Sequence, residues 1–208
     1  MSKKRKFEES IELTLKLNVD PTQGDQNIRG TCILPAGTGN EVRVCVFTGE
    51  DQHGEAKAAG ADMIGTENLL KEIGQGAKIE FDKIICTTEQ IGTLKQYART
   101  LGPKGLMPNV KSGTLVKSDQ LADTIKQSKQ GLIEYRVDEH SFIKNKIGKR
   151  RFTDEELLSN LDAVMRSIIS RRPPSVKGKY FNRAFLKSSM GPSIKLDLAH
   201  YQELAMPE

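Results

Sequence analysis

The sequence of 208 residues has no tryptophan, and its seven phenylalanines and four tyrosines make up only 5% of the chain. Proteins that stack splayed bases of single-stranded nucleic acid need exposed aromatic rings, and a core leaves few of these to spare. No apolar run approaches the roughly 18 residues of a membrane-spanning helix, and no apolar stretch follows the start. The sequence therefore predicts neither a membrane protein nor a secreted protein.

Cysteine and histidine are also scarce, at three residues each. Cys32, Cys45 and Cys86 are far apart, form no CxxC pair and lie in apolar, strand-like runs. We expect them to be reduced and buried in a core, in a reducing compartment. The histidines share no metal-ligand spacing with one another or with a cysteine, so no metal site is expected. They are His53, His140 and His200.

Motifs of nucleotide-dependent enzymes are not matched either. Gly37-Thr38-Gly39 precedes a strand-like run and lacks the third glycine and the helix of a dinucleotide-binding turn. The run LGPKGLMPNVKSGTL at 101–115 is no Walker loop, because its glycines are too close and no Lys-Ser/Thr opens a helix. We interpret this run as a proline-stiffened interaction or packing loop. No catalytic residues and no cofactor are expected, and the chain is predicted not to be an enzyme.

Both ends of the chain contain segments in which apolar and polar residues alternate, as they do in half-buried strands. Apolar and polar residues alternate over 11–17, and TCIL at 31–34 resumes extended structure after a turn-rich stretch. We expect these two strands to pair with each other antiparallel. Further expected segments are strands at 132–137, 180–187 and 194–198 and a basic, hairpin-like run at 142–152.

One helix is expected between these strands. Thr153 and Glu156 form a capping box at its start, and Arg171-Arg172-Pro173-Pro174 ends it. Apolar side chains at helical spacing predict one broad buried face. They are Leu157, Leu158, Leu161, Val164, Met165, Ile168 and Ile169.

The middle of the chain alternates strands with helices, which favours a parallel sheet with crossover helices. The expected strands are 42–47, 63–64 and 82–87, and the expected helices are 55–62, 67–73, 89–101 and 119–131. The predicted fold class is therefore α/β. One α+β domain is assembled from both termini, and a second, α/β domain is inserted into it.

Basic residues number 32 against 27 acidic residues, and they gather in segments that contain no acid. Such a segment is often only a solvated face. Three of them, however, lie in the split domain, where they are expected to meet as a surface for phosphates. Structured RNA fits this pattern better than duplex DNA, since the basic groups lie mostly in loops and strands. The segments are 3–6, 90–118, 142–152 and 171–187.

Five segments carry distinctive sequence motifs. They read KFEESIEL at 6–13, GDQNIRG at 24–30, EAKAAGAD at 55–62, LGPKGLMPNVKSGTL at 101–115 and KSSMGPSIKLDL at 187–198. In this order they closely resemble the L1 family of large-subunit ribosomal proteins, in its bacterial and organellar type. The matches cover essentially the whole chain, and LGPKGLMPN is a highly specific signature.

The resemblance implies a fold and a function. It implies a split rRNA-binding domain of residues 1–36 and 131–208 and an inserted Rossmann-like domain of residues 37–130. It further implies a structural protein of the mobile stalk beside the exit site, which assists the release of deacylated tRNA. The implied partners are stalk rRNA, exit-site tRNA and other ribosomal proteins. An alternative is a translational repressor that binds its own mRNA leader.

The resemblance also implies RNA-contacting residues on the first strand and in the loop before the last strand. The strand residues are Lys6, Phe7, Ser10 and Glu12, and the loop residues are Ser188, Ser189, Met190 and Gly191, with Gly178 and Lys179 expected nearby. Lys149 is added because of the basic segment around it. The family loop usually reads Thr-Met-Gly-Pro, and Ser189 replaces its threonine, which keeps the hydroxyl and loses a methyl group.

The start of the chain departs from the family pattern. Bacterial members usually have a helical segment of several tens of residues before the Lys-Phe strand, and this chain begins almost at that strand. We expect any contact of that segment to be lost or to be made by another protein. The shortening favours the ribosome of an organelle, a mitochondrion, over that of the bacterial cytoplasm.

Overall fold

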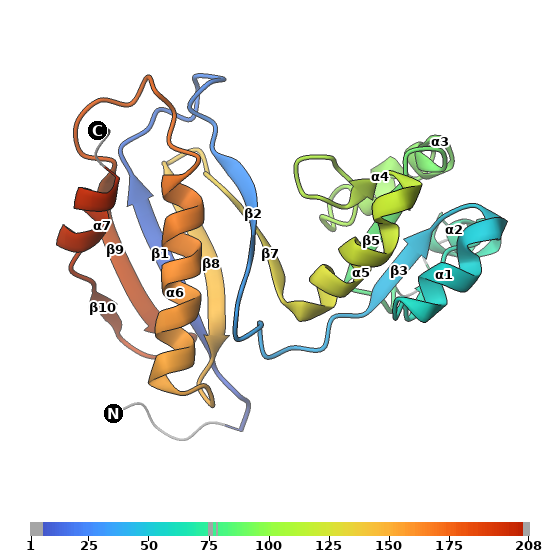
Figure 1. Cartoon of the computed structure of the whole chain (residues 1–208), viewed down its shortest axis with the longest axis horizontal. Helices are drawn as coiled ribbons and strands as arrows, with labels where there is room; N and C mark the ends of the chain where they lie inside the picture. Colours follow the sequence, from blue (N-terminus) through green and yellow to red (C-terminus); the bar gives the residue numbers. More distant parts are fainter. Residues whose placement is uncertain (1–5, 75–76, 78, 206–208) are drawn as a thin grey trace. The chain divides into compact units, whose positions relative to one another are not determined.

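The computed structural model describes residues 6–74, 77 and 79–205. The chain divides into two compact units, each with its own core. The first unit comprises Met1–Gly39 and Gly131–Glu208, and the second comprises Asn40–Gln130 (Figure 1). The sequence places the first boundary after Ala36. In the structure residues 37–39 stay with the first unit, because Asn160 Nδ2 donates to the carbonyl of Gly37 at 3.1 Å and Arg151 Nη2 donates to that of Gly39 at 3.0 Å.

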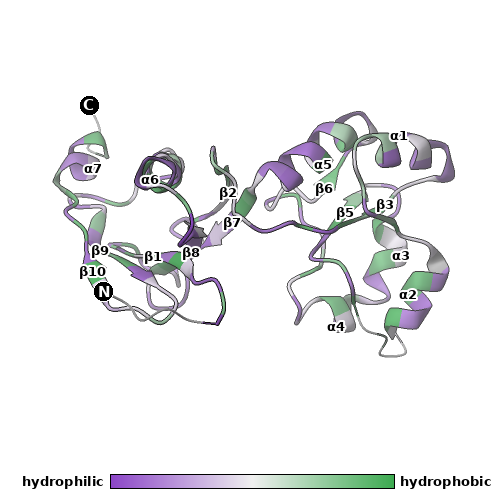
Figure 2. Cartoon of the chain, turned by 90° about the horizontal axis from the view of Figure 1, so that it is seen from below, coloured by the Kyte–Doolittle hydropathy of each residue, from purple (hydrophilic) through white to green (hydrophobic). Residues whose placement is uncertain are grey.

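The first unit is built on a four-stranded antiparallel sheet in the order β10-β9-β1-β8. Both α6 and α7 pack on the same face of this sheet (Figure 2). The strands are β1 (Ser10–Leu17), β8 (Phe142–Lys149), β9 (Phe181–Ser188) and β10 (Ser193–Lys195), and the helices are α6 (Asp154–Ile169) and α7 (Ala199–Leu204). The α+β domain that the sequence predicts from the two ends of the chain is therefore present in the structure.

The core of this unit lies between the sheet and α6. Leu13, Leu15 and Leu17 alternate along β1 and are fully buried, as their period of two predicts. The capping box is confirmed, since the Thr153 hydroxyl accepts from the Glu156 amide and the Glu156 carboxylate accepts from the Thr153 amide. Most of the expected helical stripe is buried in the same core, namely Leu161, Val164, Met165 and Ile168.

A separate two-stranded ribbon shows that one expected pairing is wrong. β2 (Arg29–Ile33) pairs antiparallel with β7 (Leu132–Arg136), not with β1. Both edges of β1 are occupied by β8 and β9, so β1 has no edge left for β2. The ribbon packs against α6 instead, where Tyr135 Oη donates to the carbonyl of Ser167 at 2.9 Å.

Three smaller expectations for the first unit are also wrong. The run 142–152 is not a hairpin, because β8 stays paired with β1 along its length. The last strand ends at Lys195, and the chain then turns Leu198 into the core at the start of α7. Leu158 is 58% exposed, although it lies only about 20° around the helix axis from the fully buried Met165 two turns later.

The second unit is a parallel sheet in the order β4-β3-β5-β6 with helices on both faces (Figures 1 and 2). α1 and α5 pack on one face, and α2, α3 and α4 on the other. The strands are β3 (Val44–Phe47), β4 (Met63–Ile64), β5 (Lys83–Thr87) and β6 (Leu115–Val116). The helices are α1 (His53–Ala58), α2 (Glu67–Gly74), α3 (Ile91–Lys95), α4 (Ala98–Leu101) and α5 (Leu121–Gln130). The expected parallel sheet with crossover helices is confirmed.

The prediction of a single helix over 89–101 is wrong. Two short helices, α3 and α4, replace it. The Tyr97 amide donates to the carbonyl of Leu94, three residues back, so the chain tightens there and α4 starts afresh. This break lets both Leu94 and Leu101 reach the same core.

All three cysteines are free and buried, as expected. Burial raises the pKa of the Cys45 and Cys86 thiols to about 12 and also raises the pKa of Cys32. Since the thiolate is the reactive species, we expect Cys45 and Cys86 to react with a thiol reagent at pH 8 roughly 1000-fold more slowly than in the denatured chain. Mass spectrometry of timed alkylation checks this. Labelling of Cys45 in the folded protein at the denatured rate would contradict it.

Candidate RNA-binding surface

Residues from three distant segments meet at one end of the four-stranded sheet. The start of β1 lies between the ends of β8 and β9, with Ser10 opposite Lys149 and Ile11 opposite Ser188. The structure thus brings together most of the residues that the resemblance implies. We call them the strand-end cluster: Lys6, Phe7, Ser10, Glu12, Lys149, Ser188, Ser189, Met190 and Gly191.

The turn after β9 is anchored to β1 by Ser189. The Ser189 hydroxyl accepts from the Ser10 amide at 3.2 Å, and the Ser189 amide donates to the Ser10 carbonyl at 3.0 Å. The Gly191 amide closes the turn on the Ser188 carbonyl at 3.1 Å, and a Cβ at Gly191 would lie 2.3 Å from the Ser188 hydroxyl oxygen. Ser189 therefore positions the turn, and Gly191 lets the turn fold closely.

Two large apolar side chains of the cluster face water. Phe7 is 55% exposed and Met190, at the tip of the turn, is 60% exposed. Neither contributes to the buried core of the unit. Both side chains are therefore available for contact with a partner.

Cationic groups gather at the same end. Lys149 Nζ lies 2.9 Å from Glu8 Oε2, and Arg150 Nη1 lies 3.0 Å from Glu9 Oε2, where Glu9 is 1% exposed. The hydrogen bond from Lys149 lowers the pKa of Glu8, so this carboxylate stays ionised. Arg151 also approaches Glu8, at 3.4 Å. The two acids are thus already shared among these cations.

Lys146 is a further cation here that was not among the predicted site residues. Its Nζ is buried and has no hydrogen-bond partner in the described part of the chain. Burial, and then repulsion from Lys149, lowers its pKa. The alternation of β8 could have identified it, because Lys146 pairs with Glu12 and so shares its face of the sheet. Glu12 itself is half-exposed, with its Oε2 3.8 Å from Lys187 Nζ.

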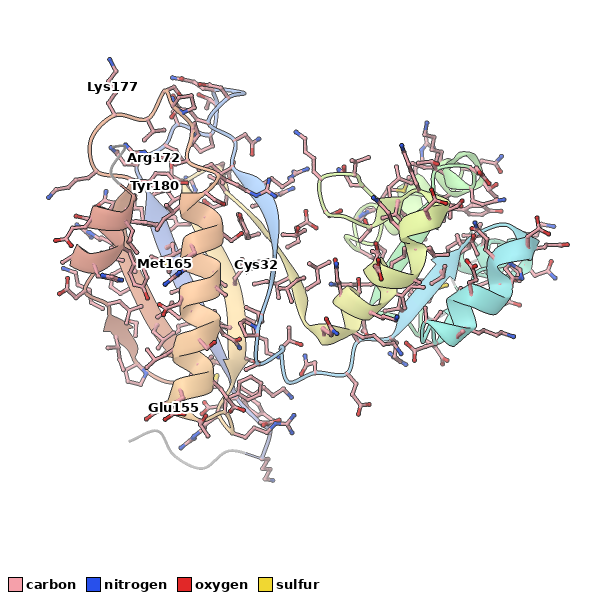
Figure 3. The ribbon with its side chains drawn as sticks, viewed as in Figure 1. Cys32, Glu155, Met165, Arg172, Lys177 and Tyr180 are labelled. Carbon is pink, nitrogen blue, oxygen red and sulfur yellow. The ribbon has the colours of Figure 1, made fainter. Side chains whose placement is uncertain are left out.

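Gly178 and Lys179 do not join the cluster. They precede β9, whereas Ser188 ends it, and an eight-residue strand is about 23 Å long. Arg172 Nη2 donates to the Gly178 carbonyl at 3.0 Å at that far end. In Figure 3, Arg172, Lys177 and Tyr180 lie at one end of α6 and Glu155 at the other. The two predicted residues thus lie away from the other nine.

The described residues hold neither a metal-binding cluster nor a membrane-spanning helix. No group of three metal-binding side chains converges there. No helix in the same ranges is long and apolar enough to cross a membrane.

The amino-acid sequence of this chain matches a family of ribosomal proteins. A family model described as "Ribosomal protein L1p/L10e family" matches residues 1–192. "Large ribosomal subunit protein uL1" of Rickettsia akari (strain Hartford) is 43% identical over 193 residues, which cover 93% of this chain and 80% of the relative. The protein of the same name from Streptomyces virginiae is 42% identical over 204 residues, covering 98% and 84%.

A third relative carries a variant of this name. "Large ribosomal subunit protein uL1c" of Trieres chinensis is 44% identical over 193 residues, covering 93% of this chain and 83% of the relative. The chain therefore belongs to the L1p/L10e family of ribosomal proteins. This family is structural rather than enzymatic, which confirms the prediction that the chain is not an enzyme.

Proposed function

We propose that this chain is a constituent of the large ribosomal subunit and that its strand-end cluster binds folded rRNA of the mobile stalk. The observation that carries the proposal is the meeting of Ser10, Lys149 and Ser188 from distant segments at one basic sheet end. Cations there supply the attraction to phosphates, and the exposed Phe7 and Met190 supply contacts with the sugar and base surface.

Family membership supports the wider role. As a stalk protein the chain would move with its rRNA, assist the release of deacylated tRNA from the exit site, and adjoin other ribosomal proteins. A folded mRNA leader is a second proposed ligand, because a surface that reads phosphates and shape also accepts a similar fold from another RNA. The mitochondrial matrix stays the first compartment to be tested, ahead of the bacterial cytoplasm.

Substitution of the two exposed apolar residues tests this function. We expect Phe7→Ala to weaken binding of a stalk rRNA fragment about tenfold, in the range of about 1–3 kcal/mol for a lost stacking contact. Met190→Ala is expected to weaken it several-fold through lost apolar burial. Melting temperatures should stay unchanged, since neither side chain is in the core. Fluorescence anisotropy and thermal unfolding provide the two readouts.

Leu158→Ala is the matched control, because Leu158 is similarly exposed in the same unit but lies on α6. It should leave RNA affinity unchanged. An mRNA leader with the same fold, measured in parallel, tests the second ligand. If Phe7→Ala and Met190→Ala both bind the stalk fragment as tightly as Leu158→Ala does, the strand-end cluster is not the RNA-binding site.

A further inference from the structure

The face of the four-stranded sheet opposite α6 and α7 is strongly basic. The buried leucines of β1 point toward the helices, so Glu12, Thr14 and Lys16 point away from them. Besides Lys149 of the strand-end cluster, which pairs with Ser10, the strand registers place six basic side chains on this outer face against one acid, Glu12, among the described strand residues. The basic residues are Lys16, Lys144, Lys146, Arg183, Lys187 and Lys195.

Most cations of the outer face have no close acidic partner among the described residues. Lys16 lies directly opposite Arg183, and like charges in such cross-strand pairs are destabilising. Within the described ranges, Lys16, Arg183 and Lys195 form no ion pair. Lys144 pairs with Asp138 at 3.0 Å, whereas Lys187 has only the half-exposed Glu12 at 3.8 Å. The sheet therefore maintains a positive field that favours an anionic partner.

Two aromatic rings share this face. Phe142 lies opposite Lys16 on one side of β1, and Phe185 lies opposite Thr14 on the other side. Both rings are partly exposed, whereas Phe181, which points inward, is fully buried. Lys16 and Lys144 hold their ammonium groups 5.3 and 5.5 Å from the centre of the Phe142 ring. Aromatic rings interleaved with cations are the arrangement on which bases stack while phosphates are neutralised.

We propose that the outer face binds a single-stranded segment of RNA, next to the folded RNA held by the strand-end cluster. The proposal rests on the proposed function, because both surfaces belong to one unit and adjoin at Glu12 and Lys146. Duplex RNA would present phosphates and 2′-hydroxyls but leave the rings without unstacked bases. An acidic protein segment would pair with the cations and likewise make no stacking contact.

Binding of fluorescein-labelled decauridylate to the full chain tests the proposal, by anisotropy at about 50 mM salt and upward. Lys16→Gln combined with Arg183→Gln should weaken binding about tenfold. It should also flatten the log–log salt slope by about 1.4, because each neutralised phosphate contributes about 0.7 for single strands. Phe142→Leu keeps an apolar side chain but removes the ring, and we expect about fivefold weaker binding.

Lys57→Gln combined with Lys126→Gln is the matched control, since it removes the same charge from exposed helical positions of the second unit. Three results would overturn the inference: wild-type protein that does not bind decauridylate, outer-face variants that bind it like the control, or tighter binding of decaglutamate than of decauridylate. The charge variant retains the core, so it remains informative if Phe142→Leu unfolds.

Failure of the proposed function is distinguishable from failure of this inference. Phe7→Ala and Met190→Ala report on the folded stalk fragment and should leave decauridylate binding unchanged. The outer-face variants report on decauridylate. Suppose that binding of the stalk fragment is unchanged in the cluster variants, while binding of decauridylate is weakened in the outer-face variants. The proposed function is then wrong, and the proposal of a single-strand surface is supported.

Discussion

Replacing Asn160 with leucine is expected to lower the free energy of unfolding of the first unit by about 4 kcal/mol. Asn160 is fully buried on α6. Its Nδ2 donates to the carbonyls of Ile147 at 2.8 Å and Gly37 at 3.1 Å, and its Oδ1 accepts from the Ala36 amide at 3.0 Å. Leucine has a similar size but can make none of these bonds. Three backbone groups would be left without their partner, each costing about 1–3 kcal/mol when buried.

Asn145→Leu is the matched control for this substitution. Its Nδ2 makes a single bond, to the Glu134 carbonyl at 3.0 Å, at a partly exposed position of β8. We expect a loss of about 1 kcal/mol or less there. Urea unfolding followed by circular dichroism measures both variants. Equal losses in the two proteins would mean that Asn160 does not anchor the chain as the hydrogen bonds indicate.

The role of Asn160 shows why local patterns predict elements better than they predict connections. The helix was foreseeable from its capping box and its apolar spacing, both of which are local. Asn160 lies on the same stripe, three residues after Leu157 and four before Val164, so a polar residue within an apolar face was a visible signal. Its partners at 36, 37 and 147 are distant in sequence, and no periodicity identifies them.

The pairing of β1 with β2 failed for a related reason. Alternation of apolar and polar residues predicts each strand and shows which side chains face inward. It does not identify the strands with which that strand pairs. Proximity in sequence favoured β2, whereas β8 and β9 arrive from more than a hundred residues away and take both edges. The parallel sheet of the second unit was easier to predict, since three of its strands, β3, β4 and β5, are each followed by a crossover helix.

The candidate site, like the fold, could be predicted only in part from the sequence. The motifs were sufficient to name Phe7, Ser189 and Met190, because the resemblance carries residues over one by one. They did not show that Ser189 is occupied in holding Ser10, or that the nitrogen of Lys146 is buried. The resemblance also implied that Lys179 lies near Ser188. The length of β9 then separates them.

Gly131→Ala is expected to cost about 3 kcal/mol of the same unit's free energy of unfolding, because backbone strain and a steric clash add. Gly131 follows α5 with a φ of +114°, a conformation that residues with a Cβ rarely adopt. An added Cβ would also lie 2.7 Å from the Cα of Gly37, which is backbone and has no rotamer by which to move away. The substitution is therefore unfavourable on two separate grounds.

Gly178→Ala separates the cost of backbone strain from the cost of the steric clash. Its φ is +73°, and nothing lies within 4 Å of an added Cβ, so it measures the strain of a left-handed backbone alone. We expect a loss of about 1 kcal/mol for it. Denaturant unfolding of both variants gives the difference that is due to the contact with Gly37. Since Asn160 holds the carbonyl of that same Gly37, combining Gly131→Ala with Asn160→Leu should cost less than the sum of the single losses. A fully additive result would show that the outgoing segment at Gly37 and the returning segment at Gly131 are stabilised independently.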